Sequence, residues 1–475
     1  MADDKAREDG AQRTDVPPDG KKRGTAQNDA RDLGVEVLLA VDQNDTYLDR
    51  ALAEVFARQD AVSRHDRAFV GRVSKGCVER RIELDYILDQ FSDTKTQKMK
   101  PVIRAILRSA LYQLLYLDAA PDAVVVNEAV RITKKRGFSG LSGFVNGVLR
   151  AIARNKDAIS CPPMDEDPVR ALSVRYSMPE WIVTRYLDAY GQERCARILE
   201  AYLAERPLCV RVDTRAKAPE EVKASLEAQG IRVTVDPRLS YAFLLEGYDR
   251  LEEIPEFADG TLYPQDVASM MAVELADPQL GDAVLDVCAA PGGKSMHAAS
   301  RIQRAGAAGD WDGQCVRAAD VRAGQVTARD LTREKTAVIR ENLARCHVPN
   351  VRAEVWDARV SDPRWVNEAD LVIADLPCSG LGVIGHKPDI KYHASEEGIR
   401  DLAEKQREIL AAAADYVRPG GTLLYSTCTM TEEENGENVQ WFLARFPAFS
   451  LARELQLLPD EGCDGFYMAK LQREA

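Results

Sequence analysis

Apolar residues in the first third of the chain recur three and four positions apart. Examples are Val35/Leu38/Leu39, Phe69/Val70/Val73 and Ile103/Ile106/Leu107. This spacing places the apolar side chains on one face of a helix. Pro101 suits a first helical turn, whereas Pro121 and the polar break at 137–140 separate helices. The pattern predicts an all-α bundle over residues 31–160.

The helical pattern is interrupted at residues 161–168, where Cys-Pro-Pro-Met-Asp-Glu-Asp-Pro predicts a linker. A helix pair is expected over 180–190 and 193–204. Three short strands are then predicted, at 208–212, 231–235 and 241–245. One further helix is expected near 219–229, between the first and the second of them. We therefore predict a small α+β linking module over residues 165–260.

Strands alternate with helices in the last part of the chain, which we take as one domain over residues 261–475. The predicted strands are 284–287, 326–329, 351–356, 371–374 and 422–426. Such alternation is typical of a Rossmann-like, doubly wound α/β domain with a mostly parallel sheet. Ligands of this fold bind outside the carboxyl ends of the strands.

Composition is that of a multidomain globular protein, with 475 residues, 45% hydrophobic and 29% charged. Residues 1–30 are polar and predict a disordered tail without a secretory signal. No apolar run is long enough for a membrane span, so no membrane partner is expected. The ten cysteines form no C-x-x-C pair, which excludes the usual zinc spacings and fits a reducing cytoplasm. We expect no metal.

Charge is unevenly distributed along the chain. Residues 64–156 hold eighteen Lys and Arg against nine Asp and Glu, an excess of nine positive charges. Because the whole chain carries −13, the remaining residues carry −22. A basic module in an acidic chain suits local contact with phosphates, although solvated helix faces rich in Lys and Arg would give the same count.

A glycine turn follows the first predicted strand of the last domain, in Cys288-Ala-Ala-Pro-Gly-Gly-Lys294. Glycines let the backbone approach a ligand closely. A phosphate-binding P-loop would need glycine at 288, and a nicotinamide fingerprint would need G-x-G-x-x-G. The turn therefore favours a nucleotide-like methyl donor.

Two acids could bind the ribose of such a donor after the second strand, Asp320 and Asp330. A helix pattern follows Asp330 but not Asp320, which favours Asp330 and makes residues from about 304 to 325 an insertion. Asp357, after the third strand, could accept a hydrogen bond from the adenine amino group. A role as a loop cap explains that residue almost as well.

Two cysteines follow predicted strands, in Asp375-Leu-Pro-Cys378 and Ser426-Thr-Cys428. Methylation of cytosine carbon 5 needs a thiolate that adds to carbon 6, a hydrogen-bond partner for the ring nitrogen, and a base. A D/N-P-P-Y motif would instead indicate amino-group methylation. Buried cysteines often only pack, and we interpret Cys288, Cys209 and Cys346 in that way. The pattern alone does not choose between Cys378 and Cys428 as nucleophile.

These motifs resemble those of the RNA 5-methylcytosine methyltransferases. The matching segments are 284–294, 375–382, 388–391, 425–429 and the closing motif Asp464-Gly-Phe-Tyr-Met-Ala-Lys470. The bundle, with Phe144-Val-Asn-Gly-Val-Leu-Arg150, resembles a NusB-type RNA-binding domain. Bundle, linking module and last domain together, over residues 32–475, resemble the bacterial small-subunit rRNA methyltransferase B family.

The resemblance implies S-adenosylmethionine as cofactor and assigns its binding residues, which are Cys288, Ala289, Ala290, Pro291, Gly292, Gly293, Lys294, Asp330, Asp357 and Asp375. It implies Cys428 as the nucleophile, with Cys378 assisting release of the methylated RNA. Asp375 would steer the base, and Lys294 would position either the base or Asp375.

The implied function is methylation of carbon 5 of one unpaired or flipped cytosine in small-subunit rRNA, through a covalent bond between a cysteine and carbon 6. We expect RNA that is not yet fully assembled as partner, and a monomeric chain. Two alternatives stay open. One is the same chemistry on tRNA or another rRNA site, and the other is a non-catalytic NusB-like RNA-binding or antitermination factor.

Departures from the family pattern concern RNA contact. The segment Arg211-Val-Asp-Thr-Arg215 carries Asp213 and lacks a lysine until Lys217, whereas the family often has Asn and Lys there. Gly385-His386-Lys387 replaces a more basic pair, and the insertion before Asp330 is unusual.

Overall fold

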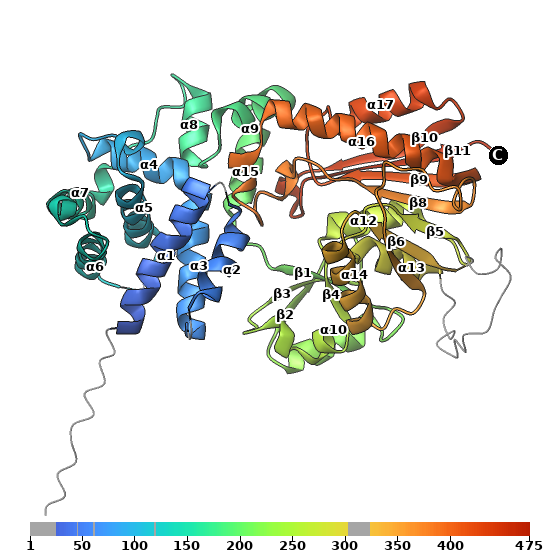
Figure 1. Cartoon of the computed structure of the whole chain (residues 1–475), viewed down its shortest axis with the longest axis horizontal. Helices are drawn as coiled ribbons and strands as arrows, with labels where there is room; N and C mark the ends of the chain where they lie inside the picture. Colours follow the sequence, from blue (N-terminus) through green and yellow to red (C-terminus); the bar gives the residue numbers. More distant parts are fainter. Residues whose placement is uncertain (1–24, 45, 60–61, 118–119, 303–323) are drawn as a thin grey trace, which may run out of the picture. The chain divides into compact units, whose positions relative to one another are not determined.

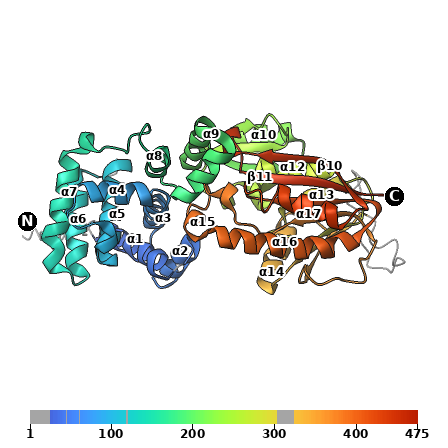
Figure 2. The ribbon, with the colours of Figure 1, turned by 90° about the horizontal axis from the view of Figure 1, so that it is seen from above.

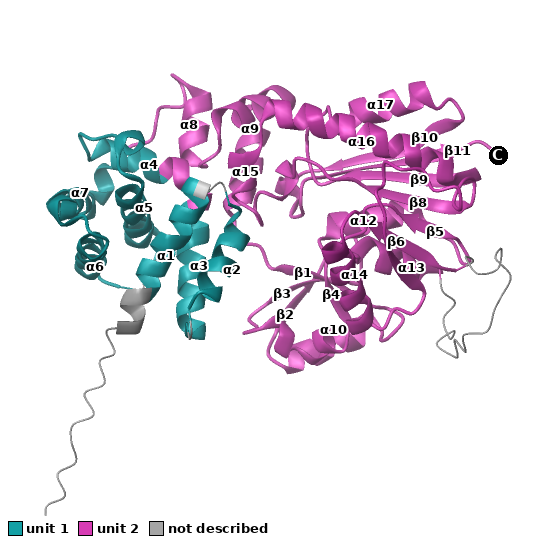
Figure 3. Ribbon diagram, in the orientation of Figure 1, with its two compact units in different colours: residues 1–77, 84–159 teal, residues 78–83, 160–475 magenta. Residues whose placement is uncertain are grey.

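The computed structural model describes residues 25–44, 46–59, 62–117, 120–302 and 324–475. Most of the predicted tail, Asp320 and most of the predicted insertion lie outside the described residues. The chain divides into two compact units, residues 1–77 with 84–159 and residues 78–83 with 160–475 (Figure 3). Among the described residues, no helix combines the length and apolar character that crossing a membrane requires.

The first unit is the predicted all-α bundle. Its helices are α1 (Thr25–Asn44), α2 (Leu48–Ala57), α3 (Arg64–Glu79), α4 (Arg81–Gln90), α5 (Pro101–Tyr116), α6 (Asp122–Lys135) and α7 (Ser142–Arg154) (Figure 1). Helix α5 is buried on all sides from Ala105 to Leu114 and packs against α1, α6 and α7. A helix buried all round is expected at the centre of a bundle. Pro101 stands in its first turn, as predicted.

Part of the positive charge counted in the sequence is neutralised inside this bundle. Arg108 on α5 is buried and pairs with Asp42 at 2.5 Å and with Asp85 at 2.6 Å. Arg136 after α6 pairs with Asp32 on α1 at 2.5 Å. Because α1 supplies two of these acids from outside residues 64–156, the bundle is less basic than that count suggests.

The second unit begins with helices and a small sheet. Helix α8 (Pro168–Arg175) precedes α9 (Glu180–Leu203), which is kinked at Gly191, where φ is 72°. The kink separates the two helices that the sequence predicts. Four antiparallel strands follow in the order β2-β3-β1-β4, and they are β1 (Leu208–Val212), β2 (Arg232–Val235), β3 (Ala242–Glu246) and β4 (Leu262–Pro264). Helices α10 (Pro219–Ala228) and α11 (Pro255–Ala258) complete this α+β module.

A seven-stranded sheet forms the centre of the rest of the unit, in the order β10-β11-β9-β8-β5-β6-β7. Its strands are β5 (Val284–Asp286), β6 (Val326–Asp330), β7 (Val351–Val355), β8 (Ala369–Asp375), β9 (Val417–Thr427), β10 (Phe449–Leu457) and β11 (Phe466–Arg473). Five neighbouring strands, in the order β7, β6, β5, β8 and β9, pair in parallel. This arrangement confirms the predicted doubly wound sheet. The antiparallel hairpin of β10 and β11 was not predicted.

Helices cover both faces of this sheet. Helices α12 (Val267–Ala276), α13 (Gly293–Ile302) and α14 (Arg333–Arg345) pack on one face, and α16 (Glu396–Tyr416) and α17 (Gly436–Arg445) lie side by side on the other (Figure 2). Strand β8 needs helices on both faces because it is apolar on both. Leu371 and Ile373 pack into the core beneath α12–α14, and Val372 and Ala374 pack into the core beneath α16 and α17. Alternate residues of a strand face opposite sides, so an almost continuously apolar strand needs cover on both.

The strand order reverses between β5 and β8. The chain runs from β5 outward through β6 to β7, then returns to the other side of β5 as β8. Such a switch point opens a crevice at the carboxyl ends of the two strands. Here those ends are Asp286 and Asp375. The short helix α15 (Ile390–His393) lies in the long connection from β8 to α16.

Candidate active site

Two cavities adjoin at this switch point. The larger has a volume of about 450 Å³ and the smaller about 240 Å³. The larger is lined by Asp330, Trp356, Asp357 and Cys378, and the smaller by Gln265, Lys294 and Phe466. Cys288, Ala290, Asp375 and Cys428 line both. A group held in one cavity can therefore meet a group held in the other at Asp375 and Cys428.

The glycine turn lies between the two cavities, since Cys288 and Ala290 line both and Gly293 lines the smaller. Gly292 has φ of +108°, a conformation that L side chains rarely adopt, so glycine is required here. A Cβ on Gly293 would lie 3.1 Å from the ring of Tyr263, which leaves almost no room for a side chain. The turn leads directly into α13, as the sequence predicts.

Asp330 is the last residue of β6 and is 4% exposed. One of its oxygens accepts from the amide of Ala290 at 3.0 Å, and the other accepts from the amide of Leu331 at 2.8 Å and pairs with Lys335 at 3.1 Å. Asp330 thus fixes the glycine turn to the second strand while it faces the larger cavity. A carboxylate has about four lone-pair sites, so capacity for a ligand hydroxyl remains.

Asp357 faces the same cavity from the loop after β7. Its carboxylate accepts two hydrogen bonds from the guanidinium of Arg359, at 3.0 and 2.7 Å. These hydrogen bonds hold the pKa of Asp357 below its usual value. In this state Asp357 is engaged within its own loop, as a loop cap would be.

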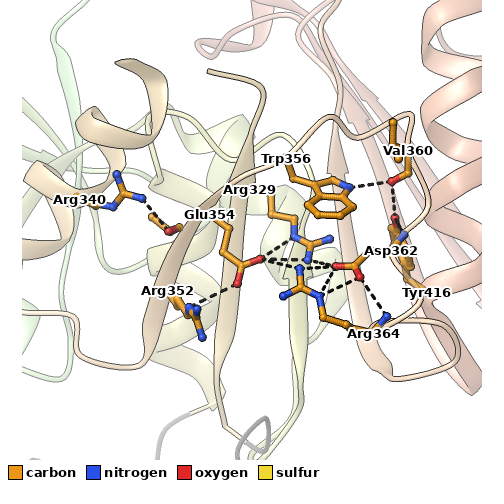
Figure 4. Close-up of polar contacts among 10 residues, drawn as sticks. Arg329, Arg340, Arg352, Glu354, Trp356, Val360, Asp362, Arg364 and Tyr416 are labelled. Carbon is orange, nitrogen blue, oxygen red and sulfur yellow. Dashed lines mark hydrogen bonds and ion pairs between the residues drawn. The ribbon is translucent and has the colours of Figure 1, made fainter. Parts of the chain in front are cut away.

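A buried ionic network anchors that loop (Figure 4). Arg329, 1% exposed, pairs with Asp362 at 2.5 Å and with Glu354 at 3.1 Å. Its guanidinium lies 4.8 Å from the ring centre of Trp356, whose indole N–H donates to the carbonyl of Val360 at 2.8 Å. The loop from 356 to 362, which carries Asp357, is thereby held against the ends of β6 and β7. Apart from an arginine inside a predicted strand, no local sequence signal indicated this network.

Lys294 and Asp375 meet beside the smaller cavity. The Lys294 Nζ lies 2.7 Å from Asp375 Oδ2, and Ser426 Oγ donates to Asp375 Oδ1 at 2.7 Å. The ammonium also lies 4.9 Å from the ring centre of Phe466. The contact fits one of the two roles that the resemblance implies for Lys294, whereas the contributions of Ser426 and Phe466 were missed. Ser426 stands two positions before Cys428, which was the available signal.

The two cysteines lie against each other. Cys378 Sγ is 3.2 Å from Cys428 Sγ. The hydrogen bond with Cys428, together with burial, raises the pKa of the Cys378 thiol well above its usual value. A neutral Cys378 beside Cys428 leaves at most one negative charge on the sulfur pair.

The other cysteines differ in environment. Cys346 is buried in the core, and Cys209 packs against the same core, in keeping with a packing role. Cys288 packs against the opposite layer but also lines both cavities. Burial raises the pKa of the Cys288 thiol, so its side chain is a neutral wall of the site.

A charged cluster closes the far side of the smaller cavity. Asp464 accepts from Arg206 at 2.5 Å, and its amide donates to Asp266 at 3.1 Å. His386 lies 3.3 Å from Asp464 and 3.0 Å from the same guanidinium. Arg206 already supplies the positive charge next to the carboxylates of Asp266 and Asp464. The cluster is therefore an ionic network in the wall of the smaller cavity.

Family models match three parts of the chain. A model described as "16S rRNA methyltransferase RsmB/F" matches residues 273–472, a NusB family model matches 28–154, and an RsmF/B-like ferredoxin-like domain matches 178–250. A curated protein of Bacillus subtilis named "Probable ribosomal RNA small subunit methyltransferase B" is 35% identical, covering 94% of this chain and 98% of that protein. The chain belongs to the RsmB/F methyltransferase family.

Further relatives agree with this family assignment. "Ribosomal RNA small subunit methyltransferase B" of Cronobacter sakazakii is 32% identical over 87% of this chain and 92% of its own length. The structure titled "Crystal Structure of PH0851" superposes with a TM-score of 0.73, at 23% identity, over 94% of this chain and 99% of that one. That likeness supports the fold, including the helical unit, the ferredoxin-like module and the methyltransferase domain.

Proposed function

We propose that this protein transfers a methyl group from S-adenosylmethionine to carbon 5 of a cytosine in small-subunit rRNA. The observation that carries the proposal is the placement of Cys428 and Asp375 where the two cavities meet. A donor in the larger cavity and a base in the smaller one would face each other across these two side chains. Membership of a methyltransferase family supports the same reaction class.

The larger cavity suits the donor. A volume of about 450 Å³ is within the usual range for cofactor pockets, and Cys288 and Ala290 of the glycine turn line it. Asp330 would accept from the ribose hydroxyls and Asp357 from the adenine amino group, after exchanging one hydrogen bond from Arg359. When bound, S-adenosylmethionine supplies an electrophilic methyl group.

The smaller cavity suits the target base. Asp375 would contact the ring-nitrogen edge of the cytosine, and its orientation is fixed by Lys294 and Ser426. Lys294 keeps further N–H donors for an oxygen of the base. A base can enter such a pocket only when it is unpaired or flipped out of its stack.

Cys428 acts as the nucleophile in this mechanism. Its sulfur forms a bond to carbon 6, and the electron pair of the 5,6 double bond makes carbon 5 nucleophilic. Carbon 5 then takes the methyl group, and the bond between the methyl carbon and the donor sulfur breaks with its electron pair staying on the sulfur. Loss of the carbon 5 proton to a base restores the double bond as the sulfur–carbon 6 bond breaks, and Cys428 leaves as a thiolate. Cys378, 3.2 Å away, assists this release.

Support for an RNA partner comes from the other parts of the chain. The NusB family model covers residues 28–154, and the names of the full-length relatives specify the small ribosomal subunit. The bundle would hold phosphates near the target, and the linking module would orient the strand. A partly assembled RNA as substrate and a monomeric chain stay predictions.

Methyl transfer to RNA lacking this modification tests the proposal. Cys428→Ala should abolish transfer of a labelled methyl group, whereas Cys346→Ala, a change at a buried packing cysteine, should preserve it. Normal turnover by Cys428→Ala would contradict the assigned role. Bisulfite mapping of rRNA and tRNA from cells without the gene identifies the target and separates the tRNA alternative. An absence of donor binding by calorimetry would instead favour a non-catalytic RNA-binding factor.

A further inference from the structure

Glu434 is a completely buried carboxylate that the proposed mechanism does not use. It lies six positions after Cys428, in the loop between β9 and α17, and its side chain is 0% exposed. A charge is costly to bury unless several hydrogen bonds stabilise it. The donors around Glu434 therefore indicate why the protein keeps it.

Four groups donate to this carboxylate. Oε1 accepts from the Ser379 amide at 2.8 Å and from Gln406 Nε2 at 3.0 Å. Oε2 accepts from Ser379 Oγ at 2.5 Å and from Thr431 Oγ1 at 2.7 Å. Two oxygens that accept four hydrogen bonds and donate none match an ionised carboxylate.

Three of the four donor groups come from the two loops that carry the active-site cysteines, and the fourth, Gln406, lies on α16. Ser379 follows Cys378 directly, and Thr431 lies three positions after Cys428. Ser379 Oγ also lies 2.7 Å from Thr429 Oγ1, and Gln406 donates in addition to the carbonyl of Pro377 at 2.9 Å. Glu434 is thus the common acceptor that joins the loop after β8 to the loop after β9.

The same carboxylate is a fixed negative charge beside Cys378. After the hydrogen bond with Cys428, burial and the charge on Cys428, the Glu434 charge further raises the pKa of the Cys378 thiol. Two thiolates 3.2 Å apart would repel each other strongly. A charge that keeps one sulfur neutral leaves the other free to carry the negative charge.

We propose that Glu434 is a positioning residue that sets the two cysteine loops in register and keeps Cys378 an uncharged thiol while Cys428 attacks. The proposal rests on the proposed function, because it assigns a task to each cysteine. It adds a residue outside both cavities that makes the two chemically identical side chains behave differently.

Glu434→Gln tests the charge with little change in shape. The glutamine oxygen can take the place of Oε1 and accept hydrogen bonds from the Ser379 amide and from Gln406. Its amide N–H groups can take the place of Oε2, because the hydroxyls of Ser379 and Thr431 can turn round and accept. The variant therefore retains the contacts and loses the charge.

The readout is alkylation of Cys378 by iodoacetamide as a function of pH, followed on the peptide that contains it. We expect the midpoint to fall by about one pH unit or more in Glu434→Gln, within the range that a nearby like charge shifts a pKa. Measuring it in a Cys428→Ser background removes the other sulfur from the comparison. Glu432→Gln, which removes an equal but exposed charge two positions away, should leave the midpoint unchanged.

Glu434→Asp tests the register. It keeps the charge but shortens the side chain. The pH midpoint of Cys378 alkylation should therefore stay high, and the affinity for S-adenosylmethionine should be retained. The kcat for methyl transfer should fall at least tenfold. Should Glu434→Gln fail to fold, this variant alone decides, because wild-type kcat in it would overturn the proposal.

An unchanged alkylation midpoint in folded Glu434→Gln would also overturn the proposal. The outcome is separable from failure of the proposed function. If wild-type protein transfers no methyl group to any RNA, the function is wrong, whereas thiol titration still reports whether Glu434 distinguishes the two cysteines.

Discussion

Cys378 Sγ lies 3.2 Å from Cys428 Sγ, although the two residues are fifty positions apart in the chain. They follow neighbouring parallel strands, β8 and β9, whose carboxyl ends share one edge of the sheet. The contact makes the two thiols a chemical pair. The roles proposed for Cys428 and Cys378, and their expected response to oxidation, both depend on this contact.

Mild oxidation should inactivate the enzyme reversibly. Hydrogen peroxide can take two electrons and two protons from the pair, leaving a disulfide between Cys378 and Cys428 and forming water. We expect methyl transfer to be lost and then restored by dithiothreitol. Peptide mapping should find these two residues linked. Recovery of both as separate alkylatable thiols after full inactivation would contradict the prediction.

Asp330→Asn should weaken donor binding. A hydrogen bond to a charged group contributes about 1.5–3 kcal/mol, so the Kd for S-adenosylmethionine should rise roughly 10- to 100-fold. Calorimetry measures this directly, and a thermal melt shows whether the glycine turn that Asp330 holds stays in place. Glu334→Gln, an exposed change on the first turn of α14, is the control. Unchanged affinity in folded Asp330→Asn would exclude the ribose contact.

Gly382→Ala should destabilise the second unit. A Cβ at this position would lie 1.8 Å from the carbonyl oxygen of Gly465 and 2.8 Å from that of Cys428, so backbone must move. Overpacking of this kind costs about 1–3 kcal/mol. Urea unfolding should show the loss, together with reduced activity because the Cys428 loop shifts.

Gly385→Ala is the matched control for that change. Its Cβ would make ordinary contacts, the nearest 3.5 Å from the carbonyl oxygen of Tyr202. We expect little change in unfolding free energy. Equal stability of the two variants would contradict the close packing of Gly382 on Gly465.

His297 should make the second unit sensitive to acid. The side chain is 2% exposed, and burial lowers its pKa to about 4, below the usual value of 6.5. Between these values the unfolded chain binds the proton and the folded chain does not. Stability is therefore complete above pH 6.5 and falls as pH drops toward 4, by roughly 1.4 kcal/mol per pH unit at most.

His297→Gln removes this titration and should flatten that part of the stability profile, as measured by urea unfolding from pH 4 to 7. Replacing the exposed His65 with Gln should leave the profile unchanged. A wild-type slope in His297→Gln would show that other groups cause the acid sensitivity.

The sequence predicted what local patterns determine. Helical spacing identified α5, and alternation of strands and helices identified the parallel strands whose ends carry Asp330, Asp375 and Cys428. Adjacent glycines indicated the turn into α13. Each of these signals lies within a few residues of the feature that it predicts.

Long-range partners could not be predicted in the same way. Glu434 acquires its role only when Ser379, fifty-five positions away, folds onto it. Arg329 is an ordinary strand residue until Asp362 and Trp356 enclose it. The β10–β11 hairpin was missed although turn-forming residues, Pro459, Gly462 and Gly465, lie between its two strands.

The covalent bond to RNA is the most direct test of the account. Cys378→Ala protein, incubated with target RNA and S-adenosylmethionine, should accumulate an adduct that survives denaturing electrophoresis, since attack proceeds and release is impaired. Mass spectrometry of the digested adduct should place the methylated cytosine on Cys428, and the double variant with Cys428→Ala should form none. An adduct on another residue, or its persistence in the double variant, would contradict the account.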